Sequence, residues 1–135
     1  MLKIGISNEE QLAHLTQVIA KRVLVSPTNL FLFANVQELL PRLLTALSPR
    51  FPRLISAGHV SPDIPIAADR AGMNVTEQLG VSPFSASTDA ALSGIVDGSE
   101  LLYVANPNRV SGANFGFADL ETLVKAVPNG FLLID

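Results

Sequence analysis

Short apolar runs separated by stretches of helical periodicity set the pattern of this chain. Amphipathic helices are expected over 9–25, 35–48, 62–71, 87–96 and 119–127. Strands are expected over 30–34, 53–57, 73–78, 101–105 and 131–134. Most of these runs are continuously apolar, as is typical of strands covered on both faces. The run at 73–78 is more polar and is expected at an edge of the sheet.

The alternation of helices and strands determines the expected fold class. Strands joined through helices favour parallel pairing, with helices on both faces of the sheet. The prediction is an α/β fold with three αβα layers and a mostly parallel sheet of about five strands. A length of 135 residues is enough for one domain with a core, so we expect a single domain over 1–135.

Composition narrows the classes of partner. Hydrophobic residues make up 48% and charged residues 16% of the chain, and mean hydropathy is +0.38. This excess predicts burial against another part of a larger protein or a second subunit, such as a dimer partner. The net charge of −3 without a basic stripe argues against nucleic acid, and the apolar runs are too short for a membrane span. Without a signal-peptide pattern, a cytoplasmic location is expected.

Candidate chemistry lies where strands end. Ligands of open α/β sheets bind beyond the carboxyl ends of the strands. Those positions are 35–37, 58–61, 106–112 and Asp135. Cysteine is absent, and the two histidines, His14 and His59, are too few for a histidine-rich metal site.

Two of these segments together carry a family resemblance. Asn106-Pro107-Asn108-Arg109-Val110-Ser111-Gly112 follows one apolar strand, and a helix then leads to a second apolar strand ending in Asp135. The order and spacing resemble the fold-type I enzymes that use pyridoxal 5′-phosphate (PLP), class I/II aminotransferases of the histidinol-phosphate aminotransferase kind. The similarity spans roughly 10–135 and corresponds to the N-terminal part of the large domain.

The resemblance implies cofactor-binding roles for six residues. Asp135 would pair with the pyridine nitrogen of PLP, keeping it protonated so that the ring accepts electrons from the substrate. Arg109 stands where the family has an Asn that binds the phenolic oxygen. The remaining positions are the phosphate loop and the residue beside the ring, namely Asn35, Val36, Gln37 and Ser61.

Several positions depart from the family pattern. Val36 is bulky and lacks a hydroxyl, Ser61 replaces a stacking aromatic residue, and Arg109 replaces Asn. The Lys that holds the cofactor follows the Asp in the family. The lysines here are Lys3, Lys21 and Lys125. None occupies that position, so this chain by itself is expected to be inactive, and no catalytic residue is assigned.

Three functions follow as alternatives. The first is a fragment of a PLP-dependent aminotransferase that transfers an amino group to or from a small amino acid or keto acid. The second is a cofactor-less PLP-fold module with an interaction or structural role, which the departures at Val36, Ser61 and Arg109 favour. The third is a flavodoxin-like binding domain, although Phe33-Ala34-Asn35 provides neither acidic nor glycine-rich residues at the first strand end.

The resemblance also predicts an open sheet. In the family, strands from beyond Asp135 lie between the first and the fifth strand of this region. Exposed apolar edges pair readily with other strands. We therefore expect either that 30–34 pairs beside 131–134, or that an oligomer covers both edges.

Overall fold

The computed structural model describes residues 9–82 and 84–135. Its contacts divide the chain into two compact units, Met1–Val36 and Gln37–Asp135. The helices are α1 (Glu9–Val23), the 3₁₀ turn η1 (Pro27–Asn29), α2 (Val36–Leu47), α3 (Asp63–Arg70), α4 (Thr88–Ser93) and α5 (Phe117–Ala126). The strands are β1 (Arg53–Ala57), β2 (Asn74–Gln78), β3 (Leu101–Val104) and β4 (Phe131–Ile134).

The first unit consists of α1 and the turn η1. Acidic residues occupy the first turn of α1 and basic residues its last turn, which matches the helix dipole. Ala20 is buried, but the apolar side chains of Leu12 and Leu15 are exposed. No helix in the described part of the chain is long and apolar enough to cross a membrane.

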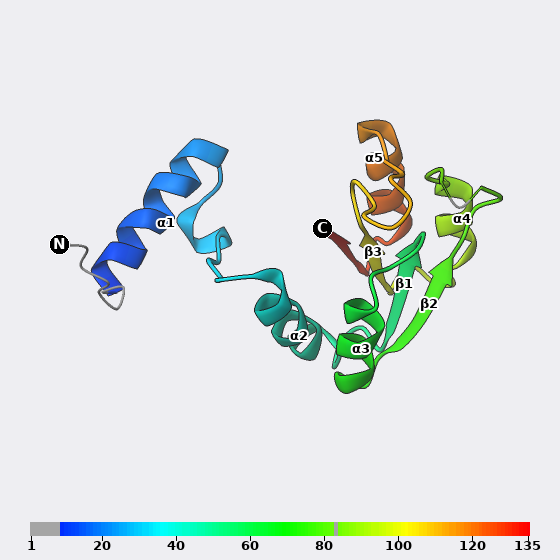
Figure 1. Ribbon diagram of the computed structural model, residues 1–135, viewed down its shortest axis with the longest axis horizontal. Helices are drawn as coiled ribbons and strands as arrows, with labels where there is room; N and C mark the ends of the chain where they lie inside the picture. Colours follow the sequence, from blue (N-terminus) through cyan, green and yellow to red (C-terminus); the bar gives the residue numbers. More distant parts are fainter. Residues whose placement is uncertain (1–8, 83) are drawn as a thin grey trace. The chain divides into compact units, whose positions relative to one another are not determined.

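The second unit contains a four-stranded sheet in the order β2-β1-β3-β4 (Figure 1). Every neighbouring pair is parallel. This confirms the predicted α/β class and places the more polar β2 at an edge, as expected. Predicted and observed boundaries of these strands differ by about one residue at most.

The run 30–34 is not a strand, so the prediction of a fifth strand is wrong. Its backbone is extended at Leu30, with φ −122° and ψ 125°, and Phe31 is 77% exposed. An extended segment becomes a strand only when a neighbour satisfies its backbone donors and acceptors. The described sheet does not include the run, and so the expected pairing beside 131–134 is also absent from it.

Helices cover both faces of the sheet, which confirms the three αβα layers (Figure 1). One core joins α2 and α3 to the sheet through side chains that include Leu44, Leu54 and Leu101. The other joins α4 and α5 to it through side chains that include Leu102 and Leu123. Successive residues of β3 therefore face opposite cores, as the period of two requires.

A buried carboxylate closes the end of the sheet where the strands begin, which we call the amino edge. Glu100, directly before β3, has a fully buried side chain. Its Oε1 accepts bonds from Arg53 Nη2 at 2.6 Å, Val96 N at 2.9 Å and Asp97 N at 3.3 Å. Its Oε2 has no hydrogen-bond partner within 9–82 and 84–135. The acid thus ties the loop before β3 to the first residue of β1.

Candidate site at the carboxyl edge of the sheet

The loop after β3 starts with Asn106, at the end of the sheet where the strands end, which we call the carboxyl edge. The side chain of Asn106 closes this loop by bonding to its far end. Its Nδ2 donates to Phe115 O at 3.2 Å, and its Oδ1 accepts from Phe115 N at 2.7 Å. This two-way pairing brings together residues nine positions apart in the chain. The side chain therefore bonds to the loop backbone through both a donor and an acceptor, as a neighbouring strand would.

Asn108 shapes the interior of the same loop. Its side chain is buried, and Oδ1 accepts from Val110 N and Ser111 N, both at 3.0 Å. Its Nδ2 donates to His59 O at 2.7 Å, which fixes the loop to the segment after β1. Gly112 follows with φ 74°, a left-handed conformation that glycine adopts at little cost. Two asparagines thus build the loop before any ligand is bound.

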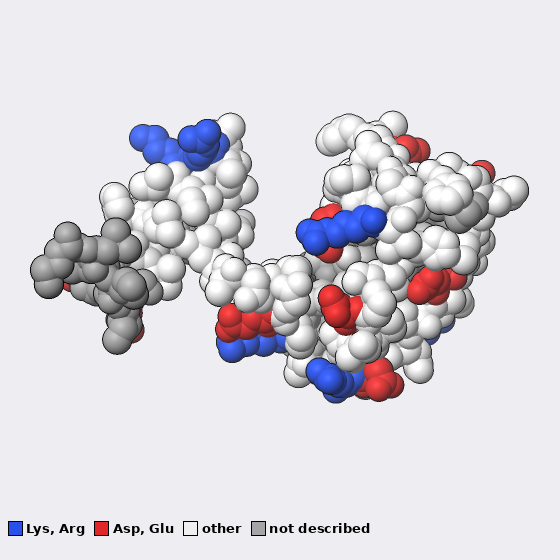
Figure 2. All heavy atoms as spheres, viewed as in Figure 1, with Lys and Arg blue, Asp and Glu red and all other residues white. Residues whose placement is uncertain are grey.

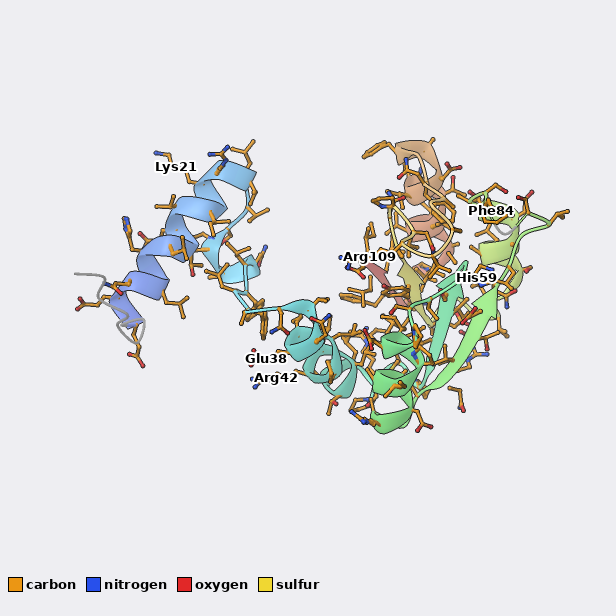
Figure 3. The ribbon with its side chains drawn as sticks, viewed as in Figure 1. Lys21, Glu38, Arg42, His59, Phe84 and Arg109 are labelled. Carbon is orange, nitrogen blue, oxygen red and sulfur yellow. The ribbon has the colours of Figure 1, made fainter. Side chains whose placement is uncertain are left out.

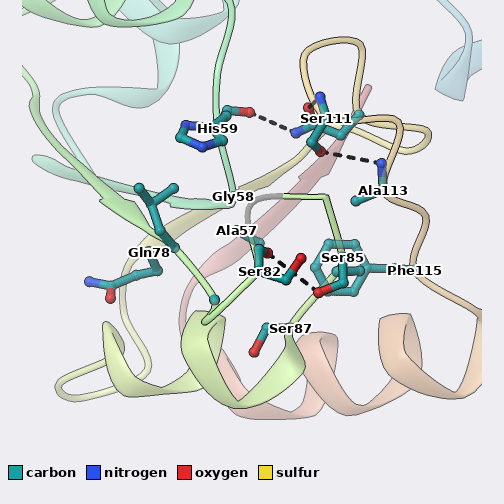
Figure 4. Close-up of a pocket in the computed structure, with 14 residues that line it drawn as sticks. Ala57, Gly58, His59, Gln78, Ser82, Ser85, Ser87, Ser111, Ala113 and Phe115 are labelled. Atoms are coloured by element: carbon teal, nitrogen blue, oxygen red, sulfur yellow. Dashed lines mark hydrogen bonds between the residues drawn. The ribbon is translucent and has the colours of Figure 1, made fainter.

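A small cavity lies between this loop and the ends of β1 and β2 (Figure 4). Gly58, Gln78, Ser87, Asn108 and Phe115 are among its lining residues, and its volume is about 20 Å³. That is room for about one water molecule. A ring-sized ligand does not fit there, and Asp135 is not part of its wall.

Tyr103 and Asp135 meet at the carboxyl edge because of the strand register. β3 and β4 pair Tyr103 with Leu133. Since side chains two residues apart share a face, Asp135 lies on the same face as Tyr103. Tyr103 Oη donates a hydrogen bond of 2.7 Å to Asp135 Oδ2. Backbone bonds from Asp135 N to Val104 O and from Asn106 N to Asp135 O continue the pairing to this point.

The phenol and the carboxylate sit in different environments. Tyr103 is 3% exposed, whereas Asp135 is exposed. Burial raises the pKa of Tyr103 far above its usual value, and the hydrogen bond to Asp135 and that residue's negative charge raise it further. The positive charge of Arg109 lowers this pKa, so its guanidinium acts on the phenol. At neutral pH Tyr103 is a hydrogen-bond donor to Asp135.

Arg109 lies on the exposed part of the loop after β3 (Figure 3). It is one of the six predicted cofactor-binding residues, and its positive charge acts on Tyr103. A cation and an anion thus flank one buried phenol at the carboxyl edge. Charged side chains elsewhere on the face shown form small groups separated by uncharged surface (Figure 2).

The other predicted site residues are divided between the two units. Ser61 is half-buried before α3, and neither a hydrogen bond nor an ion pair joins it to Asp135 or Arg109 among the described residues. Gln37 lines a hollow of about 210 Å³ between α2 and α3. Asn35 and Val36 belong to the first unit. The Nδ1 atom of His59 lies 3.5 Å from Glu77 Oε2.

Comparison with known proteins addresses the family. No protein-family model matches the chain. Histidinol-phosphate aminotransferase of Paracoccus denitrificans is 40% identical over 47 residues, which is 35% of this chain and 13% of that protein. The Mycobacterium leprae (strain Br4923) protein of the same name is 33% identical over 72 residues, which is 53% of this chain and 19% of that protein.

Solved structures extend the match over almost the whole chain. A protein from Erwinia carotovora atroseptica superposes with a TM-score of 0.80 at 18% identity, covering 96% of this chain and 38% of that one. Histidinol-phosphate aminotransferase from Sinorhizobium meliloti, solved with pyridoxal-5′-phosphate, gives 0.72 at 18% identity, covering 91% and 34%. The chain is a partial match to the fold-type I PLP aminotransferases.

This partial match confirms the predicted fold. The second unit has the fold of part of an aminotransferase large domain. The chain spans about a third of the structures and less than a fifth of the curated aminotransferases that it matches. The matches favour the aminotransferase interpretation over the flavodoxin-like one.

Pyridoxal 5′-phosphate is the cofactor that these aminotransferases imply. Its ring fits the residues at the carboxyl edge. Asp135 is exposed, and within 9–82 and 84–135 its Oδ1 accepts no hydrogen bond, so it has capacity for a protonated ring nitrogen. The cation of Arg109 suits a negatively charged phenolic oxygen. At the start of α2, where the family resemblance puts the phosphate loop, Gln37 supplies a side-chain amide. The groups that could bind the phosphate are therefore less complete than those that could bind the ring.

Sequence reasoning missed two residues of this site, Tyr103 and Asn108. Tyr103 is the one tyrosine of the chain and interrupts an otherwise aliphatic strand. With parallel pairing assumed, its register opposite 133 would have placed it on the face of Asp135. Asn108 belongs to the predicted segment 106–112, but its side chain bonds to the backbone of the loop and of His59.

Proposed function

We propose that this chain is part of a PLP-dependent aminotransferase and that its carboxyl edge binds the cofactor. In this proposal Asp135 binds the ring nitrogen of the cofactor. The observation that supports this most directly is the exposed Asp135 carboxylate, held by Tyr103 at the carboxyl edge of an aminotransferase-type sheet. The whole protein would transfer an amino group to or from a small amino acid or keto acid. Histidinol phosphate is the first substrate to test, since the curated relatives carry it in their names.

Each residue of the proposed site has a separate task. When bound, PLP supplies an electron-withdrawing ring that stabilises negative charge at the substrate's α-carbon. Asp135 holds the proton on the ring nitrogen by placing a negative charge beside it. Arg109 binds the phenolic oxygen as a cation. Asn35, Val36 and Gln37 would offer backbone donors to the phosphate, and Ser61 would take the position that the family resemblance gives to the residue beside the ring.

A second copy is the proposed partner. Phe117, Val124 and Ile134 are exposed around a largely apolar groove of about 320 Å³ between α5 and β4. Patches of this kind mark surfaces that another chain or domain covers. A homodimer is therefore part of this proposal.

The test is binding of pyridoxine 5′-phosphate to the chain, followed by nuclear magnetic resonance of the backbone amides. This ligand carries an alcohol where PLP has an aldehyde, so it does not react with exposed lysines. We expect amide shifts at 106–112 and at Asp135, and their loss in Asp135→Asn. The matched control is Asp69→Asn, an exposed carboxylate on α3. Absence of binding at millimolar ligand would refute the cofactor role of this chain.

The alternative of a cofactor-less interaction module rests on the departures at Val36, Ser61 and Arg109. The same titration separates the two. A module would show no shifts at the carboxyl edge, yet it would retain self-association through its apolar surface. Sedimentation of the chain over a range of concentrations measures that association independently of any ligand.

A further inference from the structure

We propose that Tyr103 is a positioning residue for Asp135, holding one carboxylate oxygen so that the other is presented to a protonated heteroaromatic nitrogen. The inference rests on the proposed function for the identity of that nitrogen. The coupling between the two side chains is independent of the proposed function, because the hydrogen bond of 2.7 Å carries it.

The geometry gives the two oxygens of Asp135 different surroundings. Oδ2 accepts the phenol hydrogen, while Oδ1 accepts no bond within 9–82 and 84–135. An exposed aspartate without such a contact samples several rotamers, because solvent satisfies each of them equally. The bond from a buried phenol selects one rotamer in advance, and a ligand then does not have to order the side chain itself.

The tyrosine is well placed to act on its partner in this way. Its ring is packed in the core beside α2 and α3, so the phenol oxygen is fixed by burial. Asp135 and Arg109 are the charged groups that act on it, and both lie at the open end of the sheet. The rigid partner is thus in the core and the adjustable partner is at the surface. The conformation of Asp135 is thus fixed by Tyr103 on β3.

The test measures the side-chain rotamer of Asp135 in the chain without any cofactor. Three-bond couplings from the backbone nitrogen and carbonyl to Cγ report the χ1 angle. We expect one rotamer in the wild type and averaging over two or more in Tyr103→Phe, which removes only the hydroxyl. The amide of Asp135, bonded to Val104 O, is the internal control, because its hydrogen exchange reports whether the strand end is intact. One rotamer in the variant, or averaging in the wild type, overturns the proposal.

A second measurement separates this proposal from the proposed function. If pyridoxine 5′-phosphate binds the wild type, its affinity should fall about tenfold in Tyr103→Phe, the effect of losing one hydrogen bond to a charged group. Equal affinity in both proteins overturns the positioning role while leaving the cofactor role intact. Absence of binding to both proteins refutes the cofactor role, and the rotamer measurement still decides whether Tyr103 positions Asp135.

Discussion

The two ends of the sheet each carry a carboxylate held by a side chain of the neighbouring strand, and they differ in how fully it is enclosed. At the amino edge, Glu100 is fully buried and its Oε1 accepts three hydrogen bonds from Arg53 and the preceding loop. At the carboxyl edge, Asp135 is exposed and Tyr103 holds one of its oxygens. The first carboxylate fastens a loop, and the second is held through one of its oxygens.

The difference shows how one kind of interaction serves stability or binding according to burial. Removing a partner from a buried charge leaves the other group uncompensated, which is costly. An exposed carboxylate exchanges its partner for water with little loss. Substitution of Glu100 should therefore change stability most, and substitution of Asp135 should change ordering and titration.

The largest effect is expected from Glu100→Ala. The substitution leaves the amides of Val96 and Asp97 without their acceptor and Arg53 without its closest partner. We expect a loss of about 3 kcal/mol in the free energy of unfolding, measured by urea denaturation.

The matched control for this substitution is Glu121→Ala, which breaks an exposed pair with Lys125 on α5. It should cost about 0.5 kcal/mol or less. Equal losses in the two variants would contradict the structural role assigned to Glu100.

Asn108→Ala should have the next largest effect, since it tests whether the carboxyl-edge loop is built by its own side chains. The substitution removes three hydrogen bonds to backbone groups of the loop and of His59. The expected cost is about 2 kcal/mol in urea denaturation. Asn114→Ala, at an exposed position of the same loop, is the control and should change stability little. If both variants are equally stable, the loop does not depend on Asn108.

A smaller effect is expected from the acid titration of Glu100. Burial opposes its charge, but the amides of Val96, Glu100 and Asp97, together with Arg53, hold its pKa below the ordinary value of 4.5. A lowered pKa contributes stability that is present above the ordinary value and is lost as pH falls through the folded value. Glu100→Gln should therefore flatten the decline of unfolding free energy below pH 4.5. An unchanged acid slope would show that another group controls it.

Sequence reasoning succeeded where a segment's surroundings follow from its own pattern. The continuous apolar run of β3 is a strand because helices that the sequence also indicates bury both of its faces. The run 30–34 looks the same in sequence, yet it is not part of the described sheet. A strand forms only where a neighbour satisfies its backbone donors and acceptors. The apolar pattern of a segment predicts that it is buried, whereas its pairing as a strand depends on another segment elsewhere in the chain.

The candidate site was predicted unevenly for the same reason. Asp135 and the 106–112 loop could be found because motif and strand end coincide in the sequence. Tyr103 and Glu100 could not be found, because their roles depend on register between strands that are tens of residues apart. A titratable residue within or beside a strand gains its meaning from the neighbour across the sheet.

The smallest effect on stability, and the sharpest test of the carboxyl edge, is expected from Asp135→Asn. The chain has one tyrosine and no tryptophan, so its near-ultraviolet absorbance reports the ionisation of Tyr103 alone. Burial, the hydrogen bond to Asp135 and that residue's charge all raise the pKa of Tyr103. The variant removes the charge and weakens the bond but keeps the burial, so the phenol should ionise at a lower pH than in the wild type.

The sign of the linked stability change follows from the same shift. A raised folded pKa contributes stability that is fully present below the unfolded value, about 10 for tyrosine, and is lost as pH rises toward the folded value. In Asp135→Asn the loss begins at the same pH and ends sooner, so the total alkaline loss is smaller. Asp69→Asn should leave both the absorbance titration and the alkaline stability unchanged. If Asp135→Asn also leaves them unchanged, Tyr103 and Asp135 are not coupled, and the two edges differ only in burial.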